Sequence, residues 1–510
     1  MWPVVALLVV FFGTTLPLIM GGGNIGRYAW DQVNYHEKVI RTFTLQWPSP
    51  DVSNYLSATT PLYHFVLAAV GKFISDSPAM LQFTGMLFSL GLMVTFALSL
   101  ARQVTAVRVF IFTLVLMSSL YVFPAAVWML PDNAAWWGVL GVLLIAWRCR
   151  FDMTLVVGGG VLMVLLVLTR QSHLWAAAAL WASAWMSLDA RRPHPHQSLR
   201  SPLGKVEEAR RKAGGPPAPQ EKSGVAAGGS SVAHDGDDEA LPKGTLRRIF
   251  THPGRRFART FVMVLATLPA FAIVAWFRHV WGGRLYPPVF DIQLKYPPNF
   301  STPVFIFAVF GAINVFFAGF LLPRLAVLWR YAPMLAIGIA VAMVGVACLA
   351  PTSLSEADGR FGALWTIGAK FPLVQERSLL IIALAVWGGF ALLGWCAALQ
   401  RGPRIVVLVA LAGFIAAQSI GHLAFQRYCE PMLLILTLLL AARTPEWPGP
   451  KWLHPFKTLG PALLAILMGA YTAADLRRAK PVVDEGTSLQ WVPGLPGHAQ
   501  PARPTTPGSP

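Results

Sequence analysis

The sequence predicts a membrane protein of many spans that is built entirely of α-helices. The chain is 55% hydrophobic and only 13% charged, whereas an average soluble domain has about 25% charged residues. The charges are grouped between apolar stretches of about 20 residues, the length of helix that crosses a bilayer core. Backbone groups in lipid must be satisfied internally, so these stretches must be helices. Their solid apolar character excludes a membrane β-barrel, whose strands alternate in polarity.

The apolar stretches give about thirteen candidate spans, of which some, such as 134–147 and 429–442, are short for a full crossing. We therefore expect about 11–13 transmembrane helices. No Lys or Arg precedes the first stretch, which predicts a retained helix and not a cleaved signal peptide. The short apolar stretch 61–74 is expected to be an interfacial or re-entrant helix. In chain order the spans lie near 2–20, 79–101, 108–123, 134–147, 153–169, 172–188, 260–280, 303–322, 331–350, 378–399, 405–424, 429–442 and 458–475.

The positions of Lys and Arg predict the orientation of these spans. With the N-terminus in the cytoplasm, most of the basic residues fall in cytoplasmic segments, as the positive-inside rule requires. The same pattern accounts for the net charge of +18 without nucleic-acid binding. Arg477, Arg478 and Lys480 would then lie outside, so either the last segment does not cross or late charges are tolerated. The cytoplasmic segments are 102–107, 148–152, 189–259, 323–330, 400–404 and 443–457, and the large outer loops are 21–78, 281–302 and 351–377.

Composition divides the chain into two membrane modules and two polar segments. Residues 189–259 are rich in Pro, Gly, Ser and charge, a composition that cannot bury an apolar core and predicts a flexible cytoplasmic loop. The predicted organisation is an N-terminal module, 1–188, with the first outer loop, 21–78; the flexible basic loop, 189–259; a C-terminal module, 260–475; and a disordered tail, 476–510. No internal repeat of the kind found in many transporters is present.

The first outer loop contains two candidate motifs. Asp31 follows the first predicted helix closely, so its carboxylate would lie near the membrane surface, where it could accept a proton from a sugar hydroxyl. The alternative is an ordinary solvated loop residue. Thr59, Thr60 and Pro61 precede the short apolar helix, and helix capping alone would explain them. The other interpretation is that Thr60 or Tyr63 lines a site.

Three later segments place charge beside apolar sequence. Arg170 joins two spans with almost no loop, so it is either functional or a snorkelling residue beside an interfacial Trp. Arg427 could hold an anionic phosphate with its forked donors, or pair with Glu430 one helical turn away. Asp358 and Arg360 occupy the third outer loop, where solvated charge is the alternative. There is no Walker A, zinc or dinucleotide motif, and the four cysteines have neither metal-ligand nor disulfide spacing.

Taken in order, these positions resemble the GT-C type, polyprenyl-phosphate-sugar-dependent glycosyltransferases. They are most similar to the alpha-1,2-glucosyltransferase family that adds the last glucose to the dolichol-linked oligosaccharide. That family has a Tyr-x-Asp-Glu-x-x-His-like motif, a Thr-Thr-x-Pro-Gly-Leu-Tyr-like stretch, an Arg-Gln-Thr-Asn-x-x-Trp-like motif, an Asp-Asn-Arg-His-Tyr-like loop and a late Phe-Arg-Tyr motif. The corresponding segments here are 31–36, 59–63, 170–175, 358–361 and 426–428. Departures occur at Gln32, Ser172, His173, Gly359 and Phe361, which leaves the exact sugars open.

The resemblance implies an inverting transfer of a hexose from a polyprenyl-phosphate sugar, such as dolichyl phosphate glucose, to a hydroxyl of a lipid-linked glycan or a related acceptor. It implies a GT-C helix bundle with short interfacial helices in the first outer loop. Asp31 would be the general base, and Arg360, Arg427 and Arg170 would bind the donor phosphate. No cofactor is implied, and a divalent metal is possible but not required. Substrate binding would fall to His36, Thr60, Tyr63, Gln171, Trp175, Asp358 and Tyr428.

Two other classes of function fit the composition. A secondary transporter or lipid flippase would explain the helices and the intramembrane charges, but it predicts broken helices near the middle of the membrane. A catalytically inert scaffold is the third possibility. Convergence of Asp31, Arg360 and Arg427 on one outer cavity would favour the enzyme. The short outer loops favour a bacterial inner membrane, with the endoplasmic reticulum as the alternative and the active site on the non-cytoplasmic face.

Overall fold

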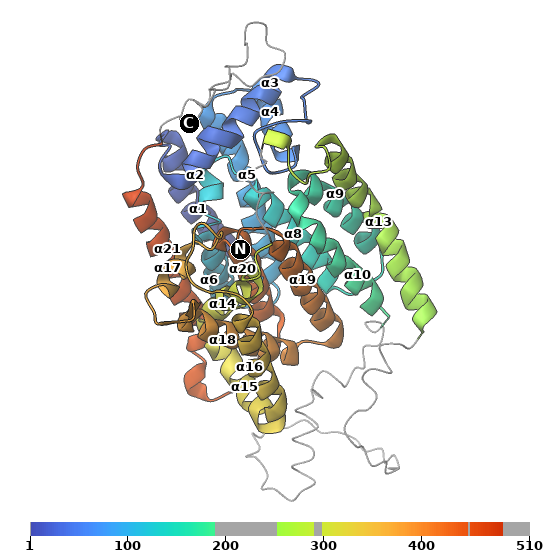
Figure 1. The fold of residues 1–510 in the computed structure, drawn as a ribbon, viewed down its shortest axis with the longest axis vertical. Coiled ribbons are helices and arrows are strands. Elements are labelled where there is room, and N and C mark those ends of the chain that lie inside the picture. The colour runs from blue at the N-terminus through green and yellow to red at the C-terminus, as the bar shows by residue number, and fades with distance from the viewer. Residues whose placement is uncertain (1, 189–251, 290–297, 447–448, 483–510) are drawn as a thin grey trace, which may run out of the picture.

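The computed structural model describes residues 2–188, 252–289, 298–446 and 449–482, and in these ranges it is a bundle of α-helices (Figure 1). The exception is a hairpin of two-residue strands, β1 (Leu373–Val374) and β2 (Arg377–Ser378). Each predicted span coincides with a helix or with a pair of helical segments. The prediction of an all-helical, multi-span membrane protein is therefore confirmed.

The N-terminal module contains six long helical segments. They are α1 (Trp2–Met20), α5 (Pro78–Leu100), α6 (Ala106–Met117), α8 (Asp132–Trp147), α9 (Gly159–Thr169, after the π-helical η2, Thr154–Gly158) and α10 (Ala177–Met186, after the 3-10 helix η3, Gln171–Ala176). A four-residue helix, α7 (Pro124–Val127), precedes α8. Pro78 is the first residue of α5, a position where its missing N–H costs no hydrogen bond.

The first outer loop forms the short helices that were expected there. They are α2 (Gly26–Asp31), the π-helical η1 (Gln32–His36), α3 (Glu37–Gln46) and α4 (Leu62–Phe73). Helix α3 is amphipathic: Val39, Ile40 and Phe43 are buried, while Glu37 and Arg41 pair on the opposite face. These helices lie together at one end of the bundle (Figure 1).

The C-terminal module wraps a central helix, α20 (Gln426–Arg443), in which residues 429–442 are all buried. Because α20 runs through the core, the residues at its two ends are fixed relative to the surrounding helices. The other elements are α13 (Pro253–Val280), α14 (Thr302–Val315), α15 (Ala318–Tyr331), α16 (Pro333–Cys348), α17 (Ala363–Gly368), α18 (Leu379–Ala398), α19 (Arg401–Ile420), η6 (Lys451–Leu453) and α21 (Phe456–Arg478).

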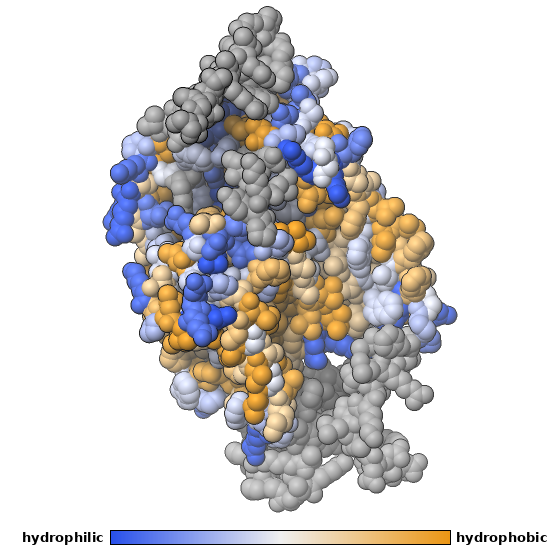
Figure 2. Space-filling model, viewed as in Figure 1, coloured by the Kyte–Doolittle hydropathy of each residue, from blue (hydrophilic) through white to orange (hydrophobic). Residues whose placement is uncertain are grey.

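Length and apolar composition identify the single helices that are long enough and apolar enough to cross a bilayer. Over the described residues six helices qualify, or seven if the bent pair α14 and α15 is one span. Five more helices in the described ranges are apolar but have only 10–17 residues: α4, α6, α8, α16 and the continuous segment of η2 and α9. The expected number of 11–13 spans therefore stays a prediction. Helix α13 is one of the six candidate spans, because it is strongly apolar and most of its residues are not buried in the bundle. Apolar side chains cover much of the face in Figure 2, where they would contact lipid acyl chains.

Three predicted boundaries were wrong. The stretch 303–322 is two helices bent by 108° at residues 316–317. At this bend α21 packs closely: a Cβ on Gly460 would lie 2.0 Å from the Phe316 carbonyl oxygen. Helix α6 ends at Met117 instead of residue 123. Helix α13 begins at Pro253, so residues 253–259 are helical and not part of a flexible loop; the guanidinium of Arg256 donates to the Trp185 carbonyl there. The rest of the loop, 189–251, lies outside the described residues.

The end of the described chain is attached to its beginning. The N–H of Gly26 donates to the Lys480 carbonyl (3.0 Å), and the N–H of Val482 donates to the Asn24 carbonyl (2.8 Å). Helix α21 therefore runs the length of the bundle and places Arg477, Arg478 and Lys480 beside the first outer loop. Residues 476–482 are ordered, which corrects the predicted start of a disordered tail at 476. Residues 483–510 lie outside the described ranges.

Candidate active site

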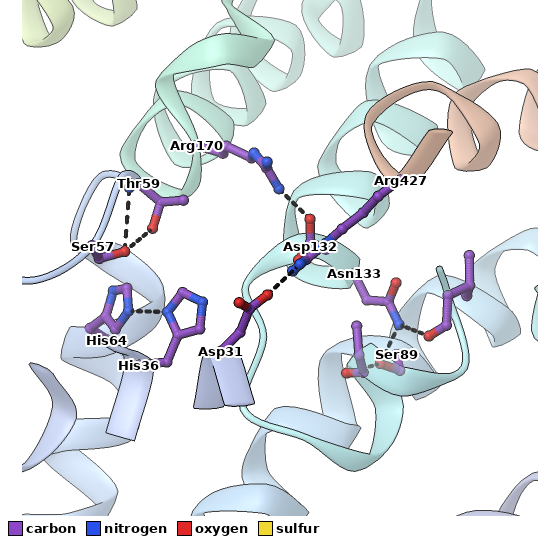
Figure 3. Close-up of polar contacts among 12 residues, drawn as sticks. Asp31, His36, Ser57, Thr59, His64, Ser89, Asp132, Asn133, Arg170 and Arg427 are labelled. Carbon is purple, nitrogen blue, oxygen red and sulfur yellow. Dashed lines mark hydrogen bonds and ion pairs between the residues drawn. The ribbon is translucent and has the colours of Figure 1, made fainter. Parts of the chain in front are cut away.

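Four charged side chains from four separate segments meet at the end of the bundle that carries α2 (Figure 3). Arg427 binds both Asp31 and Asp132; its Nη2 lies 2.8 Å from Asp132 Oδ2. Arg170 binds the other oxygen of Asp132. We call Asp31, Asp132, Arg170 and Arg427 the charged network. It brings together three residues that the sequence singled out and one that it did not.

Local backbone structure positions each member of the charged network. Asp31 ends α2, and Asp132 lies in the first turn of α8, where the helix dipole favours a carboxylate. Arg427 is the second residue of α20. Arg170 is extended, with φ −158° and ψ 105°, between α9 and η3. The side chains therefore meet because four helix ends lie at one level of the bundle.

The two carboxylates of the charged network differ in their environment. The side chain of Asp132 is 4% exposed and is bound by two guanidinium groups, whereas that of Asp31 is 23% exposed and is bound by one. Burying Asp132 would be costly without these partners, and its two ion pairs hold it in place. Asp31 is thus the carboxylate with room for another molecule. The network holds two positive and two negative charges, so its formal charge is zero.

Aromatic rings cover the two guanidinium groups of the charged network. The Cζ of Arg427 lies 5.3 Å from the ring centroid of Tyr28, and the Cζ of Arg170 lies 5.3 Å from that of Tyr428. A ring face attracts a cation and restricts its orientation. These contacts keep the forked donors of both arginines at the network.

Gln32 occupies the position where the family motif has an acidic residue, and its role here is structural. The side chain is fully buried, and its Oε1 accepts from the Gln82 amide (3.1 Å) and from the Met129 N–H (3.0 Å). Its Nε2 donates to Asn24 Oδ1 (3.2 Å). These bonds join the first outer loop to α5 and to the chain before α8, which fixes the neighbouring Asp31.

A cavity of about 600 Å³ adjoins the charged network. Arg170, Gln171, Trp175 and Tyr428 contribute to its wall, so four sequence-predicted residues face one space. Further along α10, α13 and α19 the wall is apolar, with Ala177, Trp181, Phe271, Val274 and Ala416. The cavity thus combines one cationic side chain of the network with a surface suited to an acyl or prenyl chain.

His36 lies near the charged network and contacts a second histidine. Its Nδ1 is 2.9 Å from His64 Nε2, and the rings stack with centroids 5.2 Å apart. Burial lowers the pKa of His36 to about 4, against the opposing effect of Asp31 and Asp132. The imidazole is therefore neutral at pH 7 and could contact substrate only as a neutral donor or acceptor.

This shift predicts a pH dependence of stability. The unfolded chain protonates His36 below about pH 6.5, but the folded protein does so only near pH 4, so the free energy of unfolding should fall by about 3 kcal/mol as the pH drops through this window. The thermal midpoint of the His36→Gln variant in detergent should fall less steeply with pH than that of the wild type. An unchanged pH dependence would show that His36 does not contribute to it.

Thr60 and Tyr63 are buried and are engaged in contacts within the protein. The hydroxyl of Thr60 donates to the Val167 carbonyl, and its N–H donates to Gln171 Oε1. No side chain caps α4, so the capping explanation is wrong: Thr60 joins the loop to the end of α9. Tyr63 is buried against α5, where a Cβ on Gly85 would lie 2.7 Å from its hydroxyl oxygen. Neither residue contributes to the wall of the cavity.

Asp358 and Arg360 form a separate pair in the loop before α17. Arg360 donates to Asp358 Oδ2 (2.9 Å) and to the Ser353 carbonyl (2.8 Å). The loop packs on the chain before α20, because Asn299 Nδ2 donates to the carbonyls of both Asp358 and His422 (2.8 Å each). Within the described ranges, Arg360 has no ion pair with the charged network.

The alternative pairing of Arg427 with Glu430 is wrong. Glu430 accepts hydrogen bonds from the Ser119 hydroxyl and the Gln426 amide, while Arg427 turns toward Asp31 and Asp132.

Asp132 was the functional candidate that sequence analysis missed. It directly precedes an apolar span, on the face that the charge distribution predicts to be outer, and that position was the available signal. Among the described residues no three His, Cys, Asp or Glu side chains gather as a metal site.

Comparisons with known proteins leave the family open. No family model and no curated protein sequence matches the chain. One similar solved structure is that of ArnT from Cupriavidus metallidurans bound to undecaprenyl phosphate. It is 14% identical, with a TM-score of 0.31, and the alignment covers 92% of this chain and 89% of that one. This similarity is too low to support a fold family or a function.

Proposed function

We propose that the protein is a membrane glycosyltransferase of the GT-C type that uses a polyprenyl-phosphate sugar as donor. One observation carries this proposal: the partly exposed carboxylate of Asp31 is paired with Arg427 in a network whose other guanidinium, that of Arg170, lines a cavity with apolar walls. A carboxylate can act as a general base, and paired arginines suit a phosphate. An apolar cavity suits the first isoprene units of a lipid carrier.

The proposed reaction is a single displacement at the anomeric carbon of the donor. Asp31 takes the proton from the acceptor hydroxyl while that oxygen forms a bond to the carbon. The bond from the carbon to the phosphate oxygen breaks, and its electron pair remains on the phosphate. Arg427 and Arg170 stabilise this charge. Attack opposite the leaving phosphate inverts the anomeric centre.

Arg427 connects donor binding to the state of the base. In the structure it pairs with Asp31 and Asp132, so an entering phosphate competes with Asp31 for its donors. Asp132, which also binds Arg170, is the positioning residue that holds both guanidinium groups in place. Arg427 lies in the first turn of an 18-residue helix, whose N-terminal dipole adds to the attraction for phosphate. In this scheme a bound donor releases Asp31 for proton transfer.

The finer assignments rest on the resemblance of the motifs. We assign a hexose donor, a lipid-linked or related glycan acceptor, and a site on the non-cytoplasmic face. Gln171, Trp175 and Tyr428, which line the cavity, are the proposed donor contacts, and neutral His36 is the proposed acceptor contact. The guanidinium of Arg360 is already bound by Asp358 and the Ser353 carbonyl, so we assign it a smaller part in phosphate binding.

A transporter would be expected to have a broken helix beside its binding site. The structure does contain such a break, between α14 and α15. However, α15 contacts the residues that follow α20: Arg324 donates to Thr444 and to the Pro445 carbonyl. Arg427 is at the other end of α20, an 18-residue helix that spans about 27 Å at 1.5 Å per residue. The position of the break therefore gives no support to transport through the charged network.

A transfer assay tests the proposed function directly. The purified full-length protein is incubated with a panel of polyprenyl-phosphate sugars and a lipid-linked glycan acceptor, and release of polyprenyl phosphate is measured with transfer of the sugar. We expect at least one donor to be consumed by the wild type and none to be consumed at that rate by Asp31→Asn. Movement of intact donor across vesicles without cleavage would instead identify a flippase.

A further inference from the structure

Three basic side chains lie near one acidic residue, Glu446, at the opposite end of α20 from the charged network, and two of them bind it. Arg108, from the first turn of α6, binds Glu446, and Lys457, from the first turn of α21, lies 3.2 Å from the other oxygen of that carboxylate. Arg324, on α15, donates to Thr444 Oγ1 (3.0 Å) and to the Pro445 carbonyl (2.8 Å). We call Arg108, Arg324 and Lys457 the basic cluster.

Aromatic rings hold the basic cluster together. Phe320 lies under both Arg108 and Lys457, with centroid distances of 5.7 and 6.0 Å. Arg324, one turn further along α15, lies 4.9 Å from the ring centroid of Trp395, and the rings of Trp395 and Phe320 are 6.0 Å apart. The three cations therefore face one region between α6, α15 and α21.

Two of the three members of the basic cluster are buried, and the described part of the chain gives the cluster too little negative charge. Arg324 is 4% exposed and Lys457 is 3% exposed. The hydrogen bond from Arg108 lowers the pKa of Glu446, so this carboxylate is ionised at neutral pH, but it supplies one negative charge against three positive ones. Two donors of Arg324, at Nε and Nη1, are buried without a partner in the described part of the chain. Buried charges of one sign are costly unless a counter-charge neutralises them.

We propose that the basic cluster binds a phosphate-bearing anion, supplied either by the headgroup of an anionic lipid or by free phosphate. Arginine donors match the oxygens of a phosphate group, and a basic pocket between membrane helices is the usual site for an anionic headgroup. The anion would accept from the unpartnered donors of Arg324 and offset the surplus charge. Glu446, which is 55% exposed, is the competing carboxylate that the anion would displace from Arg108 and Lys457.

The position of the basic cluster separates it from the proposed reaction. Its members lie in or beside the segments 102–107, 323–330 and 443–457, which the charge distribution assigns to the cytoplasmic face. Helix α15 also exposes Leu322 and Trp329, which would contact lipid next to the headgroup. This site does not depend on the proposed glycosyl transfer and would exist in a transporter or a scaffold as well.

Thermal stability of the full-length protein in detergent tests the proposal. The delipidated protein is mixed with phosphatidylglycerol, with zwitterionic phosphatidylcholine, or with inorganic phosphate at matched ionic strength. We expect phosphatidylglycerol to raise the thermal midpoint of the wild type and phosphatidylcholine not to raise it. The rise should disappear in Arg108→Met and Arg324→Met and persist in Arg330→Met, which removes an exposed charge from the same helix α15. A rise produced by inorganic phosphate with the same dependence on Arg324 would identify free phosphate as the ligand.

A second variant keeps the test valid if Arg324→Met does not fold. Glu446→Gln removes the competing carboxylate, so the stabilisation by the anion should become larger than in the wild type. A purely structural ion pair predicts the reverse, a less stable protein that the anion does not rescue. The proposal is overturned if neither probe raises the wild-type midpoint, or if Arg108→Met and Glu446→Gln respond to the anion as the wild type does.

Discussion

Replacement of Asp31 by Asn should lower the turnover number by about 10²–10⁴-fold, the usual contribution of a general base. The amide keeps the size of the side chain and an oxygen that can accept a hydrogen bond from Arg427, but it cannot take a proton at neutral pH. The thermal midpoint should therefore stay close to that of the wild type, and donor affinity should not fall, because the neutral amide competes less than the carboxylate with the donor phosphate for Arg427. The measurement is the initial rate at saturating donor, with the thermal midpoint recorded on the same preparation.

Glu37→Gln is the matched control for this substitution. Glu37 is a nearby carboxylate in the same outer loop, but it pairs with Arg41 on α3 and not with the charged network. Its loss should change turnover much less. A fully active Asp31→Asn enzyme would refute the assignment and direct the search to Glu37 or Asp358. Activity lost together with the thermal midpoint would mean that Asp31 is needed mainly for folding.

Replacement of Arg427 by Ala should weaken donor binding by about 2–5 kcal/mol, which is roughly a 30- to 4,000-fold rise in the dissociation constant. The side chain is the only one in the charged network that binds both carboxylates. Its removal takes away the phosphate contact and leaves Asp31 without its ion pair in that network. Binding of a polyprenyl phosphate to the purified protein measures the effect without requiring turnover.

Two further variants serve as comparisons: one tests whether positive charge alone is sufficient at position 427, and the other removes a basic residue elsewhere. Arg427→Lys keeps the positive charge but lacks the fork that binds two carboxylates at once, so its donor affinity should lie between those of the wild type and Arg427→Ala. Arg401→Ala removes a basic residue from the start of α19, on the face predicted to be cytoplasmic, and should leave affinity unchanged. If Arg427→Ala binds donor as the wild type does, the phosphate site is elsewhere.

The sequence predicted the fold well because the membrane leaves few choices. An apolar stretch in lipid must be helical, so every predicted span coincides at least in part with a helix or a pair of helical segments. The bend between α14 and α15 was not predicted, because apolar residues continue across it from 315 to 318 and the helix that packs closely there, α21, lies more than a hundred residues away. The early end of α6 was missed because the four residues 120–123 that follow Ser118 and Ser119 are apolar and buried without being helical.

The candidate site was predicted in part. Asp31, Arg170 and Arg427 could be found because each is a charged residue at the end of an apolar stretch. Of the three residues expected to converge on one cavity, Asp31 and Arg427 are in contact, whereas Arg360 pairs within its own loop. None of the three lines the cavity of about 600 Å³, which the network reaches through Arg170. Asp132 was missed because its importance arises from two arginines, 38 and 295 residues away in the chain. Thr60 was misinterpreted because its partners, Val167 and Gln171, are equally remote.

The attachment between the two ends of the described chain bears on the position of Asp31. The chain before α2 is bonded to residues 480–482, directly after α21, and Asp31 lies one short helix beyond that attachment. Each residue of α21 advances the attachment point by about 1.5 Å along the bundle and turns it by about 100°. The length of α21 therefore determines where the start of the first outer loop is held along the bundle. A one-residue insertion in α21, distant from Asp31 in sequence, would shift that carboxylate against the rigidly held Arg427.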